Sequence, residues 1–459
     1  MPQNDLTQTL ASPQVQWTIA ALGILLLAML ARELPKIPRA LLVLMAAAFV
    51  DMFGVFLVLP LVPFYAKRLA EQGTLLFGEP LLAATITGIV MSTFTVAQSL
   101  SAPLWGRFSD RCGRRPALLI ALGASAAGYV VFAFADSLWL LLLSRIVQGA
   151  GGGTVGVIQS YVADSVPPEE RARSLGWLSA ATNLGVALGP VLGSWSVTLG
   201  QQDLLPGSST LQLGAAAPGL AAALLCVLNM LFAATYLRES HTRPAADAAR
   251  ASSWPAALAT VTRPTAPASR LLLIYAIAIG AGQGITSVMA LLLNANFRIT
   301  EHEIGIVYTY IGAISVFARV LVLGRLLDRF GEARLSRIGI VTLATGLLLL
   351  PLADSLGTLA LAVGLLPVGM ALTFPCVSAL LSRVVPAADR GMYLGLQQTF
   401  GGFARIAAPN SFAHLFDYVS HALPFQVAAG CVLATLPLGF GLHRFSRKST
   451  PAPPPAAGK

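Results

Sequence analysis

The sequence predicts an all-α integral membrane protein built as two six-helix bundles, because it is too hydrophobic for a soluble domain and its spans repeat. Of the 459 residues, 56% are hydrophobic and 11% are charged, whereas soluble domains carry about 25% charged residues. With a mean hydropathy of +0.73, the polar residues cannot cover the surface of a water-soluble globule. The same composition excludes disordered, collagenous and disulfide-stapled folds.

Hydrophobic stretches define twelve predicted spans, since roughly 20 apolar residues cross about 30 Å of hydrocarbon. The first six lie near residues 40–65, 81–106, 116–135, 137–163, 173–199 and 215–236. The second six lie near residues 270–297, 302–325, 336–352, 355–384, 393–415 and 421–443. We therefore expect an N-terminal bundle at 40–236 and a C-terminal bundle at 270–445.

The basic residues predict the orientation of these spans. With residue 40 on the cytoplasmic side, all but six of the 30 Lys and Arg residues lie in cytoplasmic segments, as the positive-inside rule requires. The exceptions are Lys67, Arg68 and Arg298 outside, and Arg145, Arg319 and Arg405 within spans. The linker 237–269 and the tail 446–459 are then cytoplasmic. The net charge of +10 reflects membrane topology, so no nucleic-acid partner is expected.

Residues 1–39 contain one further hydrophobic run, from Val15 to Ala31. A signal peptide is disfavoured because residues 1–16 contain no Lys or Arg. Basic residues follow the run, which favours an extra N-terminal helix that crosses the membrane with its N-terminus outside. A helix lying in the membrane interface is the alternative.

The four cysteines have none of the paired spacings of a zinc or redox site, so no disulfide framework, metal or cofactor is expected. The sequence also lacks a nucleotide-binding loop and a catalytic constellation. We therefore expect neither an enzyme nor an ATP-driven pump.

The chain contains an internal duplication. The segment from Gly106 to Gly113 recurs from Gly324 to Gly331 with an offset of 218 residues. The segment from Val166 to Pro190 recurs from Val385 to Pro409 with an offset of 219. Two independent segments that recur with nearly the same offset indicate a duplicated six-helix unit. Such a duplication is the architecture of many secondary transporters.

The duplicated segments resemble the sequence signatures of the major facilitator superfamily. Its loop signature is matched between the second and third spans by Gly106, Asp110, Arg111, Gly113, Arg114 and Arg115. Its second signature is matched in the fourth span by Arg145 and Gly149. The resemblance covers residues 40 to about 445 and implies two six-helix bundles around a central cavity that opens alternately to each side.

Two further segments resemble the drug–proton antiporters within that superfamily. The antiporter motif is matched in the fifth span by Gly185, Gly189, Pro190 and Gly193, with Ser194 where a second glycine is usual. The first span resembles that of the tetracycline-efflux and multidrug branch through Asp51, Gly54, Pro60 and Pro63. Tetracycline exporters have an acidic residue in the third helix where this chain has Gly128. The resemblance therefore implies an antiporter whose substrate is not tetracycline itself.

Asp51 and Arg145 are ionisable residues inside predicted spans, where charge is costly and functional by default. Asp51 lies 11 residues beyond the cytoplasmic start of its helix, about 16 Å at 1.5 Å per residue. Arg145 lies about 12 Å deep by the same rise in an oppositely running helix. The two helices are neighbours in the facilitator fold, so we expect an ion pair or a near-pair.

We assign proton coupling to Asp51 and Arg145, with Asp51 as the carrier. Burial favours the neutral form of a carboxyl group, and a nearby arginine favours its charged form. Moving the arginine or admitting water would then switch the protonation state of Asp51. The proton and the substrate would compete for this one site. The alternatives are an Asp51 that stays ionised in a helix-packing network and an Arg145 that bonds backbone or polar neighbours.

Further side chains are expected around the central cavity. They are polar or adaptable residues of both halves: Gln148, Gln283, Met370, Phe374, Gln398 and Arg405. We expect Arg405 near the boundary between the halves, and Arg319 to extend to the cytoplasmic interface. Three arginines and one carboxylate within spans favour neutral, zwitterionic or anionic amphiphiles as substrates.

Charges near the loop signatures predict a cytoplasmic gate. Through the repeat, Arg114 corresponds to Glu332 and Asp164 to Arg383, so an Arg/Asp combination becomes Glu/Arg. We predict the ion pairs Arg114–Asp164 and Glu332–Arg383, each within one half and each worth about 0–1 kcal/mol if exposed. The gate also includes Asp110, Arg111 and Asp328. The two aspartates can stabilise a facing helix N-terminus.

The function predicted by these features is export of a small amphiphilic compound in exchange for protons, by a monomeric transporter in contact with membrane lipid. Proton-coupled symport, uniport of a polar metabolite and a non-transporting membrane scaffold are the alternatives. Arginine greatly outnumbers lysine and alanine is abundant, which is typical of GC-rich bacterial genomes. A bacterial inner membrane is therefore the expected location.

Overall fold

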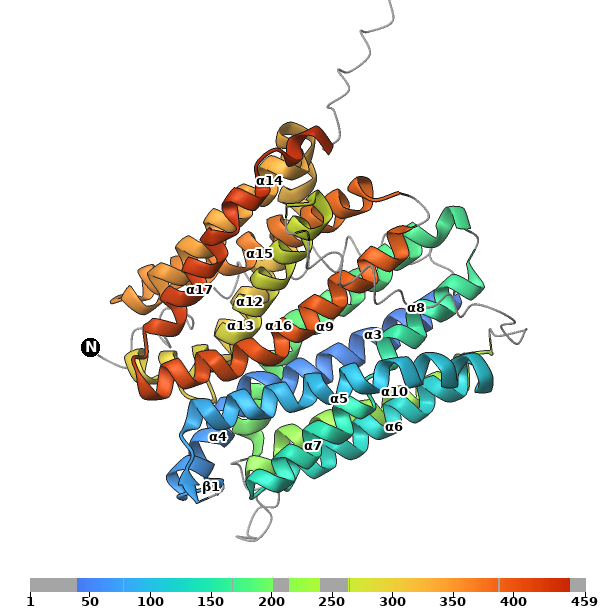
Figure 1. The fold of residues 1–459 in the computed structure, drawn as a ribbon. Helices are drawn as coiled ribbons and strands as arrows, with labels where there is room; N and C mark the ends of the chain where they lie inside the picture. Colours follow the sequence, from blue (N-terminus) through green and yellow to red (C-terminus); the bar gives the residue numbers. More distant parts are fainter. Residues whose placement is uncertain are drawn as a thin grey trace, which may run out of the picture.

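The computed structural model (Figure 1) describes residues 39–76, 78–166, 168–200, 214–239, 263, 265–386 and 389–445. These ranges contain most of both predicted bundles. The hydrophobic run from Val15 to Ala31, most of the linker 237–269 and the tail 446–459 lie outside the described residues.

The N-terminal half is a bundle of helices with one small hairpin between α4 and α5. Its helices are α3 (Arg39–Val58), η2 (Leu59–Leu61), α4 (Val62–Glu71), α5 (Ala83–Cys112), α6 (Arg114–Ala133), α7 (Leu138–Ala150), α8 (Thr154–Ser165), α9 (Pro168–Gly200), η3 (Gly214–Ala216) and α10 (Ala217–Tyr236). The hairpin pairs β1 (Leu75–Leu76) with β2 (Glu79–Pro80) antiparallel.

The C-terminal half repeats this arrangement. Its helices are α12 (Pro267–Phe297), α13 (Ile304–Phe317), the π-helix η4 (Ala318–Val322), α14 (Leu323–Leu349), η5 (Leu350–Leu352), α15 (Leu356–Val384), α16 (Arg390–Tyr418), α17 (Leu423–Ala434), η7 (Leu436–Gly439) and η8 (Leu442–Phe445). Helical structure thus covers each of the twelve predicted spans. The predicted all-α membrane fold is confirmed.

Seven helical segments of the described residues are long and apolar enough to cross a membrane, and α7, α13 and Leu423–Gly439 are shorter apolar helices. Some spans are assembled from pieces because proline or glycine interrupts the helix. Pro60 and Pro63 accompany the change from α3 through η2 to α4. Gly151, Gly152 and Gly153 form the turn between α7 and α8.

Glycine makes the same sharp turn in both halves. Gly113 joins α5 to α6 at φ 96°, and Gly331 breaks α14 at φ 70°. Only glycine adopts this backbone region without steric cost. The two residues are 218 positions apart, so the structure repeats what the sequence repeats. We call the end of the molecule with these two turns the signature end, and the other end, with β1 and the start of α5, the opposite end (Figure 1).

The two bundles meet along two helix pairs, α5 with α16 and α9 with α13. Small residues allow close approach there. A Cβ added to Gly88 would lie 2.8 Å from the Pro409 carbonyl oxygen, and one added to Gly312 would lie 2.7 Å from the Ala187 Cβ. One buried apolar cluster joins both bundles, whereas the N-terminal bundle has a separate cluster at the signature end, around Leu118 and Ile158.

Candidate functional site

Asp51 lies on α3 in the interior of the N-terminal bundle, with 7% of its surface exposed. It lines a small cavity together with Met52, Val55, Phe94, Gln98, Ser125, Tyr129, Gln148 and Gly152. The free volume, about 20 Å³, can hold about one water molecule. α3, α5, α6 and α7 each supply a polar side chain to this cavity, so its acidic group is surrounded by uncharged hydrogen-bonding groups.

Gln148 occupies the place beside Asp51 that a side chain at position 128 would need. A Cβ added to Gly128 would lie 2.4 Å from Gln148 Cγ and 3.2 Å from the Ser144 carbonyl oxygen. Gln148 itself is 4% exposed. Position 128 is thus closed to an acidic side chain unless Gln148 moves, which gives a physical reason for glycine there.

Arg145 is buried one turn away from Gln148 on α7. Its guanidinium carbon lies 4.8 Å from the centre of the Phe132 ring, and Nη2 is buried without a hydrogen-bond partner among the described residues. Within that part of the chain, Arg145 forms no ion pair with Asp51. Tyr129 lies within electrostatic range of both Asp51 and Arg145. The direct ion pair, which was one of the two arrangements expected from the sequence, is therefore not formed among the described residues.

The antiporter-like motif on α9 supports Asp51 through the backbone of α3. Added Cβ atoms on Gly185, Gly189 and Gly193 would lie 2.4, 2.7 and 2.1 Å from the carbonyl oxygens of Phe49, Phe53 and Leu57. Three turns of α9 therefore rest on three turns of α3, with Asp51 between the first two contacts. The other face of α9, at the Pro190 carbonyl, meets Gly305 of the C-terminal half. The motif lies where α3 and the boundary between the halves meet.

The predicted cavity residues of the C-terminal half gather partly around one aromatic residue that the sequence analysis missed. Tyr275 on α12 packs edge-on against Phe374, with 5.4 Å between ring centres, and accepts a hydrogen bond from Gln398 at 3.4 Å. Met370 packs over Gly282, because an added Cβ there would lie 2.3 Å from Met370 Cε. Gln283, also on α12, and Arg405, on α16, are half-buried and have no polar contact with a described side chain.

Arg319 does not extend to the membrane interface as expected. Its guanidinium donates to the side-chain oxygen of Asn183, across the boundary between α13 and α9. Arg319 lies in the π-helix η4, and such irregular turns are frequent at functional sites. Neither the irregular turn nor the contact with Asn183 can be read from the hydropathy of the sequence.

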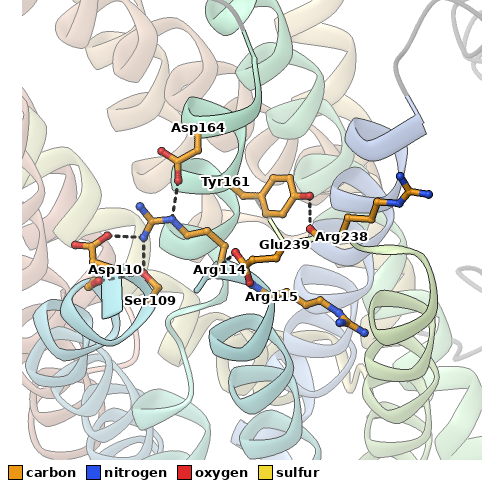
Figure 2. A network of polar contacts seen from close by, with 9 residues as sticks. Ser109, Asp110, Arg114, Arg115, Tyr161, Asp164, Arg238 and Glu239 are labelled. Carbon is orange, nitrogen blue, oxygen red and sulfur yellow. Dashed lines mark hydrogen bonds and ion pairs between the residues drawn. The ribbon is translucent and has the colours of Figure 1, made fainter. Parts of the chain in front are cut away.

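Both ion pairs predicted from the charge exchange are present at the signature end. In the N-terminal half, Arg114 Nε lies 2.8 Å from Asp164 Oδ2 and Arg114 Nη1 lies 2.6 Å from Asp110 Oδ1. Nη1 also donates to Ser109 Oγ at 2.7 Å. Figure 2 shows these acceptors around one guanidinium. The loop signature thus fixes Arg114 between the ends of α5 and α8.

In the C-terminal half, Arg383 Nη2 lies 2.7 Å from Glu332 Oε1. The energy of about 0–1 kcal/mol that is typical of exposed pairs does not apply here, because 9% of the Arg114 side chain and 2% of the Glu332 side chain are exposed. Arg114 and Glu332 each follow a glycine turn directly, so the turn places each side chain against the neighbouring helix ends. Each pair therefore contains one buried charge, for which losing a partner is costly.

The remaining gate residues lie outside these pairs. Asp328 and Arg111 pair with no charged side chain in the described part of the chain. In the N-terminal half, Asp110 pairs with Arg114 four residues later. The residue four positions after Asp328 is the acidic Glu332, so this contact has no equivalent in the C-terminal half.

The first residues after α10 are attached to the same network, which the sequence analysis missed. The Glu239 carboxylate accepts the backbone N–H groups of Arg114 at 2.8 Å and Arg115 at 3.0 Å. The Tyr161 hydroxyl donates to the Arg238 carbonyl oxygen. Glu239 caps the start of α6, where negative charge is favoured, as Figure 2 shows.

Several polar contacts between the two halves lie at the opposite end, in addition to the Arg319–Asn183 hydrogen bond across the boundary. Arg68 forms an ion pair with Glu301, and Lys67 Nζ donates to Asn294 Oδ1 at 2.8 Å. Lys67 and Arg68 are two of the three basic residues that the sequence places outside. Most basic residues lie in cytoplasmic segments, so the position of these two outside was the sequence feature that could have predicted the contacts.

Each half also caps a helix of the other half at this end. Asp417 on α16 accepts the backbone N–H groups of Ala84 at 3.3 Å and Thr85 at 2.7 Å, in the first turn of α5. Ser194 on α9 accepts the N–H of Gly305 at 2.8 Å, in the first turn of α13. The helices are equivalent in the repeat, so the two caps are reciprocal. Capping from a distant helix has no local sequence signal, so the sequence analysis did not find it.

Two membrane-embedded bundles that are related by a repeat, meet along two helix pairs and hold a buried carboxylate are typical of a secondary transporter rather than an enzyme. The sequence model of the Major Facilitator Superfamily matches residues 44–278 and 271–459. The chain belongs to this superfamily, and it is a membrane transporter.

Among characterised relatives, the chain is 29% identical over 374 residues to the class C tetracycline resistance protein of Escherichia coli, covering 82% of this chain and 89% of that protein. It is 27% identical over 391 residues to the Bos taurus major facilitator superfamily domain-containing protein 10, covering 80% and 79%. The similarity to tetracycline resistance proteins agrees with the resemblance of the first and fifth spans.

Solved structures share the fold. The human organic anion transporter MFSD10 (TETRAN) has a TM-score of 0.63 at 24% identity, covering 87% of this chain and 99% of that chain. A bacterial homologue of the human lysosomal transporter Spinster, inward-facing and occupied, has a TM-score of 0.69 at 15% identity, covering 88% and 96%.

Proposed function

We propose that this protein exports a small amphiphilic compound in exchange for protons, by alternating access. The observation that carries the proposal is Asp51, a carboxyl group buried in a small cavity whose other polar groups are uncharged. Such a group can hold a proton or a substrate but not both. The similarity to tetracycline resistance proteins supports export.

The signature end is proposed to face the cytoplasm of a bacterial cell, with the protein in the inner membrane. The excess of Lys and Arg at that end supports this orientation. The contacts between halves at the opposite end then close the outer side, so the structure corresponds to a state that is closed outward. In this state, Asp51 exchanges protons and substrate with the cytoplasm.

The transport cycle follows from competition at Asp51. Substrate entering from the cytoplasm displaces the proton from Asp51, the halves rock, and the opposite end opens. A proton from outside then binds Asp51 and releases the substrate. Arg145 and Tyr129 set the balance, because water that enters between them screens the arginine from the carboxyl group. Gly185, Gly189 and Gly193 hold α3 against α9 while the boundary moves.

The substrate is proposed to be neutral, zwitterionic or anionic. Arg145 and Arg319 carry buried nitrogens without hydrogen-bond partners in the described part of the chain, so unused cationic donors accompany the one carboxylate that the sequence places deep within the spans. The relative MFSD10 is described as an organic anion transporter. Gly128, with Gln148 over it, argues against tetracycline, although tetracycline belongs in the test panel.

The test is proton flux in proteoliposomes containing a pH-sensitive dye, with wild type and Asp51→Asn compared over a panel of amphiphiles. We expect substrate-triggered proton movement in wild type and loss of at least 90% of it in the variant. Gln397→Met, a buried change in the other half, is the matched control. Transport without proton movement would favour a uniporter, and movement in the same direction as substrate would favour a symporter. No transport of any compound would favour a scaffold.

A further inference from the structure

The Gln148 side chain carries a buried amide nitrogen without a hydrogen-bond partner in the described part of the chain. The residue is 4% exposed, and its Nε2 is buried with no acceptor. A buried amide nitrogen without a partner is destabilising, because it has lost its hydrogen bonds to water without a replacement. The missing hydrogen-bond acceptor of this nitrogen is therefore one that a bound ligand could supply.

The amide is aimed into the cavity of Asp51 by the helix beneath it. Gly128 leaves room for the Gln148 side chain on α6, since Gln148 Cγ lies 2.4 Å from where a Cβ at position 128 would be. Ser125 and Tyr129, on the same helix as that glycine, line the same cavity as Gln148 and Asp51. The amide and the carboxyl group therefore face one space from α7 and α3.

We propose that Gln148 is a specificity-determining residue whose amide N–H donates to an oxygen acceptor of the substrate when that acceptor enters the cavity beside Asp51, which has room for about one water molecule. The inference rests on the proposed function, because it deepens the same site. It defines the substrate class as amphiphiles that carry a strong oxygen acceptor, such as an amide carbonyl, a carboxylate or an N-oxide, close to the group that meets Asp51.

The proposal excludes purely cationic amphiphiles as preferred substrates. A quaternary ammonium ion can approach the Asp51 carboxylate but offers nothing to the Gln148 N–H, which stays unpaired in the complex. Sites with a buried donor discriminate against ligands that lack the matching acceptor, because the donor is then left unsatisfied. The preference for substrates with an oxygen acceptor therefore depends on the Gln148 side chain, and substitution of Gln148 should change it.

The experiment measures binding to the full chain in lipid nanodiscs by calorimetry, with two probes of nearly equal shape. Benzyldimethylamine N-oxide carries an oxygen acceptor where benzyltrimethylammonium carries a methyl group. We expect wild type to bind the N-oxide at least tenfold more tightly. Gln148→Met keeps the side-chain length but removes the donor, and should bring the two affinities within twofold. Gln148→Glu, which adds an acceptor and an ionisable group, should reverse the preference.

The control is Gln397→Met, since Gln397 is a buried glutamine whose amide already donates to Ser378 Oγ at 3.0 Å. It should keep the wild-type preference. Equal affinity of wild type for the two probes, including no detectable binding of either, would overturn the proposal, as would an unchanged preference in Gln148→Met. Because binding is measured without a proton gradient, a failure of antiport appears only in the flux assay and is distinguishable from a failure of this proposal.

Discussion

The two ends of the molecule are held together in different ways. At the signature end, the ion pairs Arg114–Asp164 and Glu332–Arg383 each join helices of one half. At the opposite end, Arg68–Glu301 and the reciprocal caps join one half to the other. The first set joins helix ends within each bundle, and the second set joins the two bundles to each other.

This difference teaches which contacts have to break during transport. Pairs within a half can persist while the halves rotate, so their role is to keep helix ends in place. In the proposed alternating-access cycle, the contacts between the halves at the opposite end are present in one state and lost in the other, so they would set the relative populations of the two states. Sequence signatures mark the first set. The second set is spread over α4, α5, α9, α12, α13 and α16 and has no common motif.

Covalently joining the halves at the opposite end should have the largest effect. In a chain with the exposed Cys112 and Cys431 changed to serine, Lys67→Cys and Asn294→Cys can be linked by a cleavable bifunctional thiol reagent about as long as the lysine side chain. Because the opposite end can then no longer open, we expect at least 90% loss of substrate transport, measured as uptake into inverted vesicles.

Each single cysteine variant treated with the same reagent is the control, and should keep more than half of the wild-type rate. Restoration of transport when the link is cleaved would confirm that the change is conformational. Full transport in the linked protein would contradict the assignment of this end as the moving closure.

Reversing a charge inside one half should have an intermediate effect. Asp164→Arg puts a second cation beside the buried Arg114 guanidinium, and breaking a buried pair costs about 3–5 kcal/mol. Asp110 and Ser109 still bind Arg114, which reduces this cost. We expect a roughly tenfold loss of transport and a lower melting temperature by differential scanning fluorimetry.

The double variant Asp164→Arg with Arg114→Asp tests whether the loss comes from the pair. Partial recovery of both transport and melting temperature is expected, since an oppositely arranged pair occurs naturally as Glu332 and Arg383. If the double variant is no better than the additive effect of the two single changes, the pair is not the reason for the charge exchange.

The sequence predicted the parts of the fold that depend on periodic or repeated residues. The apolar spans, the glycine turns at Gly113 and Gly331 and the charge exchange all leave signals at fixed spacing. The contact of the Arg145 guanidinium with the Phe132 ring was not predictable in this way, because a cation–ring contact between two helices has no fixed sequence spacing. The burial of Glu332 was not predictable either, because it depends on how the neighbouring helix ends pack, which residue spacing does not describe.

The reciprocal caps should have the smallest effect and the most informative asymmetry. Asp417→Ala removes a carboxylate that accepts two backbone N–H groups of α5, and hydrogen bonds to charged groups are worth about 1.5–3 kcal/mol. Ser194→Ala removes a neutral hydroxyl that accepts from the Gly305 N–H and donates to the Glu301 carbonyl oxygen, each bond worth about 0.5–1.5 kcal/mol. Both changes weaken the closed opposite end, so both should raise the population open there, Asp417→Ala by several-fold more. Spin-label distances between Lys67→Cys and Asn294→Cys would report the two populations. Equal shifts for the two caps would mean that charge at the helix N-terminus contributes little, and that shape alone holds this end together. Removing a contact that stabilises the closed end should favour opening. A shift towards closure in either variant would therefore mean that the cap strains the closed interface.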